Sequence, residues 1–313
     1  MLNILKEVAA DIASIQDNSG IVSADLCLKI CQQLNISYES LMIELLAVAA
    51  EYSAAPISQY KVGAIVRGAE NANGMANLYF GANVEFENQA LGHTLHAEQA
   101  AISNAWLHGE TEISALAISA PPCGHCRQFL FEVVGKNGLK ILLPKGSYSG
   151  LSPLSSDPDV NFDVIDLSQL IPAAFGPLDL GCERLLMEQS TDAINLTVGD
   201  QSDDELVQLA LAAAKACYAP YTNNFAGCAI ELSRGEIVQG RYAENAAYNP
   251  SLPPFVAAIS QAVLATKITK PLDIKRAVLV ERTTNSTQAN VTKLLIDGCF
   301  NNVELEVYYI NEN

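Results

Sequence analysis

One stretch of the chain combines residue types that can hold a metal ion with a residue that can move a proton. The segment His96-Ala97-Glu98 carries an imidazole and a carboxylate, and the run Pro122-Cys123-Gly124-His125-Cys126 carries two thiols three positions apart. All four histidines of the chain and this cysteine pair lie between positions 93 and 126. One imidazole and two thiolates suit a zinc ion that keeps a fourth coordination position open for water. We therefore predict that His96, Cys123 and Cys126 are zinc ligands.

The spacing within the two motifs gives each residue a distinct role. Pro122 is expected to open a helix, so that both cysteines face one side and the free N–H groups of the first turn favour their thiolate forms. A carboxylate two residues after the histidine can lie beside the metal without binding it. Glu98 is therefore expected to take a proton from the activated water and return it to the substrate. His125 points away from the cysteines in a helical turn, and we expect it to be a bystander.

Two other chemistries fit part of this pattern. Cys-Gly-His-Cys at a helix start that follows a strand also occurs in thiol–disulfide oxidoreductases, but that function would leave His96 and Glu98 without a role. A purely structural zinc site is the second alternative, and it would require a fourth protein ligand. His-x-Glu followed by Pro-Cys-x-x-Cys is typical of zinc deaminases. The complete set of residues therefore favours a catalytic zinc site.

Composition and charge restrict the substrate. The chain has 313 residues, of which 50% are hydrophobic and 17% charged, as expected for a soluble globular protein with room for two domains. Its formal net charge of −17 would repel a phosphate backbone, so nucleic acid is not an expected partner. Neither a membrane span nor a signal-peptide pattern is found in the sequence. We expect a cytoplasmic protein without a membrane partner that acts on a small molecule.

Alternating helices and strands are expected to position these residues. Apolar residues at three- and four-residue steps predict helices within residues 1–50. Further along, strands are expected at 60–66, 77–83, 116–119 and 140–143, and helices at 96–107 and 122–134. This alternation predicts an α/β sandwich around a central sheet.

The second half of the chain echoes the first. Residues 224–230 resemble residues 59–65, and residues 240–244 resemble residues 81–85. An offset of 159 residues, which superposes Gly81 on Gly240, then pairs the key residues of the first half with apolar ones: His96 with Phe255 and Glu98 with Ala257. We therefore expect an internal duplication in which the second copy has lost every group that could hold a metal.

Taken together, these motifs resemble the cytidine deaminase family, in its homodimeric form with a catalytic domain and a degenerate C-terminal copy. The likeness spans nearly the whole chain and is strongest over 59–134 and 217–259. It rests on Val62-Gly63-Ala64, Gly81-Ala82-Asn83-Val84-Glu85-Phe86, His96-Ala97-Glu98 and Pro122-Cys123-Gly124-His125-Cys126-Arg127-Gln128.

The resemblance implies two three-layer α/β/α sandwich domains with mixed sheets. The expected division is an N-terminal helical subdomain at 1–48, a catalytic zinc domain at 49–150, a linker at 151–190, and a degenerate domain without zinc ligands at 191–313.

The implied reaction is the hydrolytic deamination of cytidine and 2′-deoxycytidine to uridine and 2′-deoxyuridine with release of ammonia, as in pyrimidine salvage. Zinc-bound hydroxide would attack C4 of the base while Glu98 protonates N3, and Glu98 would then pass a proton to the departing amine. One Zn²⁺ per subunit and no redox cofactor are expected. The resemblance also implies a homodimer in which the C-terminal half of one subunit helps to close the site of the other.

The family pattern also assigns the substrate contacts. Asn83 and Glu85 are expected to hold the ribose hydroxyls, although Glu85 in isolation could be a solvated surface acid. Tyr60 occupies the position at which the family has an aromatic residue against the base, usually Phe, so its hydroxyl is a departure; a core residue at a strand end is the alternative. Arg127 either donates to a zinc thiolate or is a surface arginine.

Overall fold

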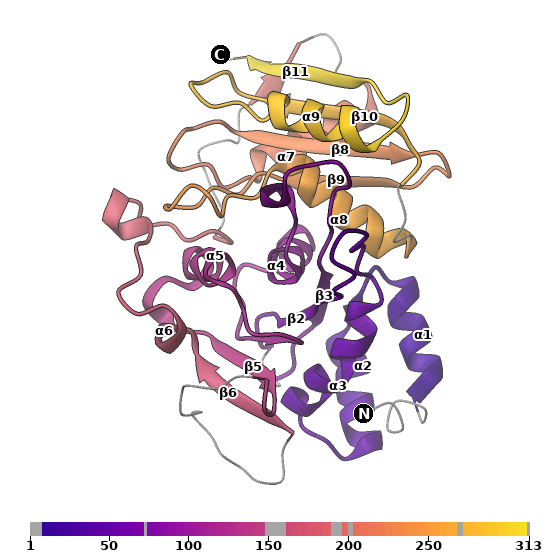
Figure 1. Cartoon of the computed structure of the whole chain (residues 1–313), viewed down its shortest axis with the longest axis vertical. Coiled ribbons are helices and arrows are strands. Elements are labelled where there is room, and N and C mark those ends of the chain that lie inside the picture. Colours follow the sequence, from indigo (N-terminus) through magenta and orange to yellow (C-terminus); the bar gives the residue numbers. More distant parts are fainter. Residues whose placement is uncertain are drawn as a thin grey trace.

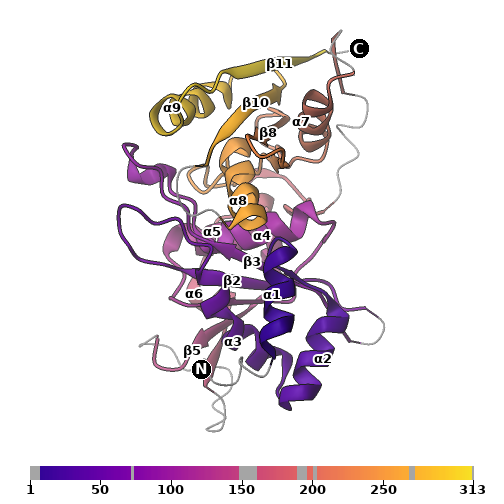
Figure 2. The same ribbon diagram turned by 90° about the vertical axis from the view of Figure 1, so that its right-hand side faces the viewer.

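The computed structural model describes residues 8–71, 74–147, 161–188, 196–199, 203–267 and 272–311. These ranges contain a six-stranded sheet in the order β1-β3-β2-β4-β5-β6 and a five-stranded sheet in the order β7-β11-β10-β8-β9. Most neighbouring strands are antiparallel, but β4 runs parallel to β5, and β10 runs parallel to β11. Each half therefore holds a mixed sheet flanked by helices, which confirms the predicted fold class (Figures 1 and 2).

The first half is built from α1 (Ala9–Asp17), β1 (Ile21–Val22), α2 (Ala24–Leu34), α3 (Tyr38–Ala50), β2 (Gly63–Arg67), β3 (Leu78–Ala82), α4 (Ala97–Leu107), β4 (Ala115–Ile118), α5 (Gly124–Val134), β5 (Lys140–Pro144), β6 (Phe162–Asp166) and α6 (Leu167–Leu170), with short 3-10 helices at Leu91–His93, Gly135–Asn137 and Pro177–Leu180. The second half comprises β7 (Thr197–Val198), α7 (Glu205–Lys215), β8 (Ala226–Leu232), β9 (Ile237–Arg241), α8 (Pro254–Thr266), β10 (Ile274–Glu281), α9 (Ala289–Cys299) and β11 (Leu305–Asn311). No helix in the described ranges is long and apolar enough to cross a membrane.

The predicted elements around the site are all present, with shifted ends. The strand expected at 60–66 begins at Gly63, because the side chain of Asn83 binds the backbone of Tyr60 and Val62 in place of a neighbouring strand. The helix expected from Pro122 begins at Gly124, with Cys123 as its N-cap. Both shifts leave the chemical groups on loops at the ends of regular elements.

Two segments outside the range expected for the catalytic domain extend its sheet. β1, from the N-terminal helical region, pairs antiparallel with β3. β6 pairs antiparallel with β5 and lies within the expected linker 151–190, which the structure describes from 161 to 188. The remaining residues of that linker lie outside the described ranges.

Glycines in the first sheet determine how closely helices approach it. A side chain at Gly63 would lie 2.6 Å from the backbone of α3, and one at Gly81 would lie 2.1 Å from the backbone nitrogen of Ala101 in α4. Only glycine permits such an approach. α4 is thereby held against β3, with His96 and Glu98 at its N-terminal end.

The second repeat has the same glycine contacts but a shorter loop before its central helix. Gly227 lies against α7 and Gly240 against α8, as Gly63 and Gly81 lie against α3 and α4. In the first repeat Val84 bridges to Leu95, and in the second the equivalent Ala243 bridges to Leu252. The loop between the bridged residues is thus two residues shorter in the second repeat.

This shortening corrects the expected residue correspondence. The N-cap of α4 is His96 and the N-cap of α8 is Pro253, so Pro253 takes the place of His96. Phe255 then takes the place of Glu98. The prediction that Phe255 and Ala257 replace them is wrong by two residues, because a constant offset cannot follow a loop that changes length.

The two helices that carry the chemical motifs lie between the sheets. Figure 1 shows α4 and α5 in the layer that separates the sheet of the first half from that of the second, with α8 beside them. One continuous cluster of buried apolar residues includes side chains from α3, α4, α5 and α8. The core of the first repeat therefore continues into the second.

The glycine contact yields a stability prediction. Gly81→Ala should lower the free energy of unfolding by about 1–3 kcal/mol, because the added methyl group would overlap the backbone of α4. Gly92→Ala is the matched control, since a Cβ there meets no atom within 4 Å. Denaturant unfolding of both variants measures the difference, and equal stabilities would contradict the proposed constraint.

Candidate metal and substrate site

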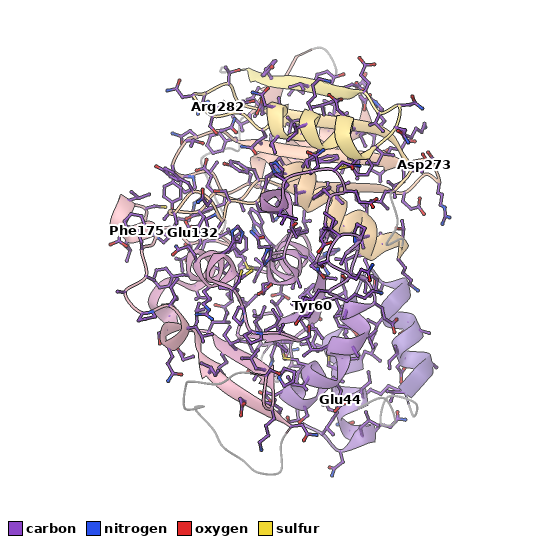
Figure 3. All side chains as sticks on the ribbon, in the orientation of Figure 1. Glu44, Tyr60, Glu132, Phe175, Asp273 and Arg282 are labelled. Carbon is purple, nitrogen blue, oxygen red and sulfur yellow. The ribbon has the colours of Figure 1, made fainter. Side chains whose placement is uncertain are left out.

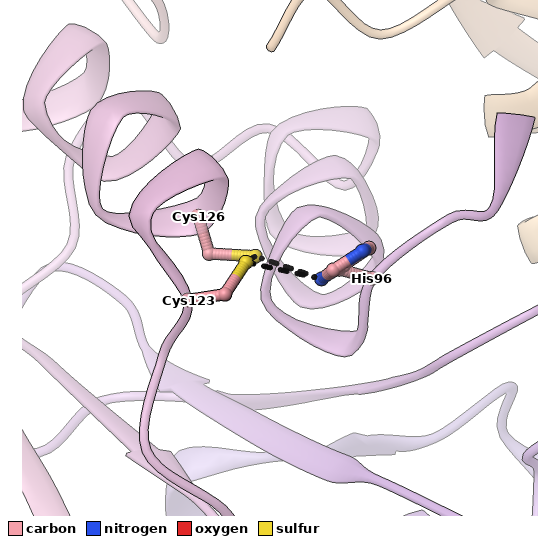
Figure 4. A group of neighbouring side chains, drawn as sticks. All are labelled: His96, Cys123 and Cys126. Carbon is pink, nitrogen blue, oxygen red and sulfur yellow. Dashed lines mark hydrogen bonds between the residues drawn. The ribbon is translucent and has the colours of Figure 1, made fainter. Parts of the chain in front are cut away.

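The three predicted metal ligands meet at the ends of two helices. His96 is the N-cap of α4, Cys123 is the N-cap of α5, and Cys126 lies in the first turn of α5 (Figure 4). The Nδ1 atom of His96 lies 3.5 Å from the sulfur of Cys123 and 3.3 Å from that of Cys126, and the two sulfurs are 3.7 Å apart. Tetrahedral zinc with ordinary bond lengths separates two sulfurs by about 3.8 Å and sulfur from nitrogen by about 3.5 Å. The spacing of the three atoms therefore fits a zinc ion.

The protonation of the cysteine pair also favours a cation at this point. Hydrogen bonds from Cys126 and His96 lower the pKa of Cys123 to about 3, so this sulfur is a thiolate. The hydrogen bond to Cys123, together with burial, raises the pKa of Cys126. Two adjacent sulfurs without a cation thus retain one proton between them, and a divalent ion bound to both would displace it.

Glu98 is a buried residue beside this metal set. Its side chain is 3% exposed, and burial raises the pKa of the carboxyl group. Together with His96 and Cys123 it lines a pocket of about 290 Å³. A carboxyl group with a raised pKa in such a pocket is suited to accept and donate protons.

The remaining wall of the pocket comes from loops at the ends of strands. It includes the three expected substrate contacts: Asn83 and Glu85 on the loop that follows β3, and Tyr60 on the segment that precedes β2. The lining residues besides the three already named are Ser58, Tyr60, Val62, Asn83, Glu85, Thr94, Ala97, Ile118, Ala120 and Pro121. The motifs did not identify Ser58, Thr94, Ile118 and Ala120, because nothing in their spacing distinguishes them from ordinary loop and strand residues.

Asn83 is a buried residue whose amide organises the loop before β2. Its Oδ1 atom accepts hydrogen bonds from the Ser53 hydroxyl at 2.6 Å and from the Val62 N–H at 2.9 Å. Its Nδ2 atom donates to the Tyr60 carbonyl at 3.0 Å. The carboxamide has two N–H groups, of which this bond uses one.

Glu85 is a bound carboxylate, and the alternative of a freely solvated acid is wrong. It accepts hydrogen bonds from the Ile57 N–H at 2.8 Å, from the Ser58 N–H at 2.9 Å, and from the Ser58 hydroxyl. Partial burial by itself would raise the pKa of Glu85, but the hydrogen bonds from Ser58 and Ile57 outweigh it and lower the pKa. The group therefore carries a negative charge at neutral pH.

Tyr60 lies at the rim of the pocket. Its side chain is 62% exposed, so the alternative of a core residue at a strand end is wrong. Ile57 and Leu91 are further exposed apolar residues of this region, at 46% and 70%. Of these three residues only Tyr60 lines the pocket, and its ring is a part of the wall that the single chain leaves uncovered.

His125 and Arg127 contact the motif without entering the metal set. The ring of His125 stacks on that of His96 with the centroids 5.4 Å apart. Arg127 donates from Nε to the Pro122 carbonyl at 2.8 Å and from its guanidinium to the Leu170 carbonyl at 3.0 Å. Arg127 thus supports the turn that presents Cys123, which is neither of the two roles expected for it.

The geometry separates the three chemical hypotheses. His96 contacts both sulfurs, a contact for which a thiol–disulfide oxidoreductase has no use. Among the described residues, the group formed by His96, Cys123 and Cys126 is the only cluster of three or more potential ligands, and it contains no fourth. Three ligands beside a buried acid fit a catalytic metal site better than a structural one.

Comparison with known proteins agrees with this site. The family described as cytidine and deoxycytidylate deaminase zinc-binding region matches residues 36–137 and, in a second form, residues 167–293. A cytidine deaminase from Aeromonas hydrophila is 45% identical over 77% of this chain and 73% of its own length. A cytidine deaminase from Vibrio cholerae is 43% identical over 78% of this chain and 74% of its own length. A cytidine deaminase from Vibrio parahaemolyticus is 42% identical over 88% of this chain and 85% of its own length.

The ligand set predicts how metal content depends on single cysteines. Cys126→Ala should purify with much less zinc than the wild type, because only two ligands remain. Cys228→Ala should retain the metal, since Cys228 is an equally buried free cysteine in β8. Elemental analysis measures both, and a full complement of zinc in the Cys126 variant would contradict the ligand set.

Proposed function

The chain belongs to the cytidine deaminase family, and from this premise we propose that it hydrolyses cytidine and 2′-deoxycytidine to uridine and 2′-deoxyuridine with release of ammonia. The observation that carries the proposal is that His96, Cys123 and Cys126 form one ligand group, and that His96 and Cys123 share a pocket with the buried Glu98. This reaction belongs to the salvage of pyrimidine nucleosides.

The protein would hold zinc through the imidazole of His96 and the thiolates of Cys123 and Cys126. When bound, zinc supplies a Lewis acid that would lower the pKa of a water molecule and stabilise negative charge on the oxygen that adds to the base. Hydrogen bonds from Cys126 and His96 already hold the pKa of Cys123 at about 3, so this residue offers a thiolate to a cation.

Glu98 would carry the protons of the reaction. The conversion adds one water, of which one proton ends on N3 of the base and the other on the departing amine. A single carboxyl group next to the site can accept each proton and deliver it in turn. Its 3% exposure keeps bulk water from exchanging with the proton in transit.

We further propose that Asn83 and Glu85 hold the ribose and that Tyr60 lies against the base. These three residues line the same pocket as Glu98, which supports a common ligand. The carboxylate of Glu85 has acceptor sites beyond those taken by Ser58 and Ile57, and vicinal hydroxyls are suitable donors. A negative Glu85 on a chain of net charge −17 favours an uncharged nucleoside over a polynucleotide.

A homodimer with shared active sites is proposed on the basis of the uncovered rim. Ile57, Tyr60 and Leu91 expose apolar surface beside a pocket whose chemistry depends on exclusion of water. The second repeat of a partner subunit is the proposed cover. Leu91→Glu should then shift the protein from dimer to monomer and lower turnover, and sedimentation at several concentrations measures the first effect. A variant that stays dimeric and active would contradict this placement of the interface.

The proposed compartment is the cytoplasm. All eight cysteines are free, including the pair at the metal site. Thiols persist in a reducing compartment. The proposal includes no membrane and no nucleic-acid partner.

Glu98→Gln tests the assignment of roles. Turnover of cytidine should fall by about 10²–10⁴-fold, because the amide cannot shuttle protons, while zinc content stays at the wild-type level. Ammonia release and elemental analysis measure the two quantities. Unimpaired turnover with normal zinc would show that another group carries the protons.

A pair of assays separates the proposed function from its alternative. The wild-type protein should release ammonia from cytidine, a chelator should abolish that release, and reduction of an insulin disulfide should not be observed. Disulfide reduction without ammonia release would instead identify a thiol–disulfide oxidoreductase.

A further inference from the structure

A buried acid in the metal-bearing helix has no part in the proposed reaction. Glu132 lies near the C-terminal end of α5, the helix that has Cys123 as its N-cap and contains Cys126. Its side chain has no exposed surface, and burial raises the pKa of its carboxyl group. Figure 3 shows it where α5 meets the loops of the second repeat.

All three groups that donate hydrogen bonds to the Glu132 carboxylate belong to the second repeat. One carboxylate oxygen accepts hydrogen bonds from the Tyr218 hydroxyl at 2.8 Å and from the Tyr221 hydroxyl. The other accepts from the backbone N–H of Ala246 at 2.9 Å. Tyr218 and Tyr221 precede β8, and Ala246 follows β9, so one carboxyl group joins α5 to two separate loops.

The loop that presents Tyr221 is itself held by a retained element of the duplicated site. Glu244 accepts hydrogen bonds from the Tyr221 and Thr222 N–H groups and from the Thr222 hydroxyl. Glu85 holds its own loop through the same three kinds of bond in the first repeat. The second repeat has thus kept this set of three hydrogen bonds, which we call the glutamate clamp, although it lacks the metal ligands. The clamp of the second repeat holds the loop from which Tyr221 reaches Glu132.

Further hydrogen bonds connect the second repeat to both helices that bear ligands. On α5, Asn245 Nδ2 donates to the Gln128 carbonyl at 3.1 Å. On α4, Gln99 Nε2 donates to the Pro250 carbonyl at 3.0 Å, and the Arg241 guanidinium donates to the Trp106 carbonyl at 2.7 Å. Figure 1 places both helices directly against the second repeat.

α5 depends on such ties more than α4 does. Gly81 brings α4 into backbone contact with β3, which limits where that helix can lie. Among the described glycines, none brings α5 into comparable backbone contact with a strand. The position of α5, and therefore of Cys123 and Cys126, rests on side-chain packing and hydrogen bonds.

We propose that the second repeat acts as a brace for the metal site, and that Glu132 is the positioning residue through which it sets α5. The bonds from Tyr218, Tyr221 and Ala246 hold the helix at the distance that places both sulfurs around His96. This inference rests on the proposed zinc site. It gives the degenerate repeat a role within its own subunit, separate from any contact with a partner.

The test is the double substitution Tyr218→Phe/Tyr221→Phe in the full chain loaded with zinc. Transfer of zinc to a coloured chelator should be about tenfold faster than in the wild type, because α5 would no longer hold the two sulfurs at the spacing that zinc requires. In the cobalt(II)-substituted protein, the sulfur-to-metal absorption bands should shift, because they report the geometry of the thiolates. Neither readout requires turnover.

Tyr79→Phe is the matched control. Tyr79 is a buried tyrosine in β3 whose hydroxyl donates to Glu110 at 2.8 Å, so this variant also loses a tyrosine–glutamate hydrogen bond. Its melting temperature should fall, but zinc release and the cobalt spectrum should match the wild type. If the double variant released zinc at the wild-type rate, or no faster than this control at equal loss of stability, the brace would be refuted.

Substitutions at Glu132 give an independent readout. Glu132→Gln keeps an oxygen for the Ala246 N–H and offers an amide that can donate to the tyrosine hydroxyls, so zinc release should stay near the wild-type rate. Glu132→Ala should release zinc as fast as the tyrosine double variant; where it does not fold, the tyrosine variants decide. If Glu132→Gln and Glu132→Ala released zinc at the same rate, the hydrogen bonds of Glu132 would not set the position of α5, and the proposal would be overturned. A wild-type protein that binds no zinc would instead refute the metal site itself.

Discussion

Two cysteine sulfurs and an imidazole nitrogen lie within 3.7 Å of one another, each at or near the N-terminal end of a helix. Without a cation only one of the two sulfurs is ionised, since adjacent thiolates repel, and a bound cation would allow both to ionise. The rest of the first repeat can be understood from this arrangement. A glycine contact holds α4 against the sheet, a turn supported by Arg127 presents Cys123, and Glu98 lies buried beside the metal set.

The two repeats show which parts of the fold depend on the chemistry and which do not. Both keep the glycines that let helices approach the sheet, and both keep a glutamate that clamps the loop before the central strand. These features maintain backbone geometry, so losing them would cost stability in either copy. The metal ligands are different. Pro253 and Phe255 occupy the positions of His96 and Glu98, and the second copy remains folded because apolar residues fill that space.

The placement of α4 and α5 between the two sheets makes the second repeat part of the environment of the site. Its loops donate hydrogen bonds to Glu132 and Gln128 and accept one from Gln99. A single apolar cluster extends through both repeats. Spacing of the ligand atoms is therefore a property of the whole chain, and the first repeat in isolation would lack the groups that satisfy a buried glutamate.

From residue types and spacing alone, the sequence determined the ligand set, the adjacent acid, the α/β class and the duplication, because ligand chemistry and hydrophobic periodicity are local properties. Only the tertiary structure decided how the repeats correspond residue by residue, since a loop shortened by two residues leaves no local trace. Asn83 and Arg127 show the same limit, because their side chains bond to backbone groups that folding alone brings near. Glu132 is the clearest case, a charged residue in a helix whose partners lie more than eighty positions away.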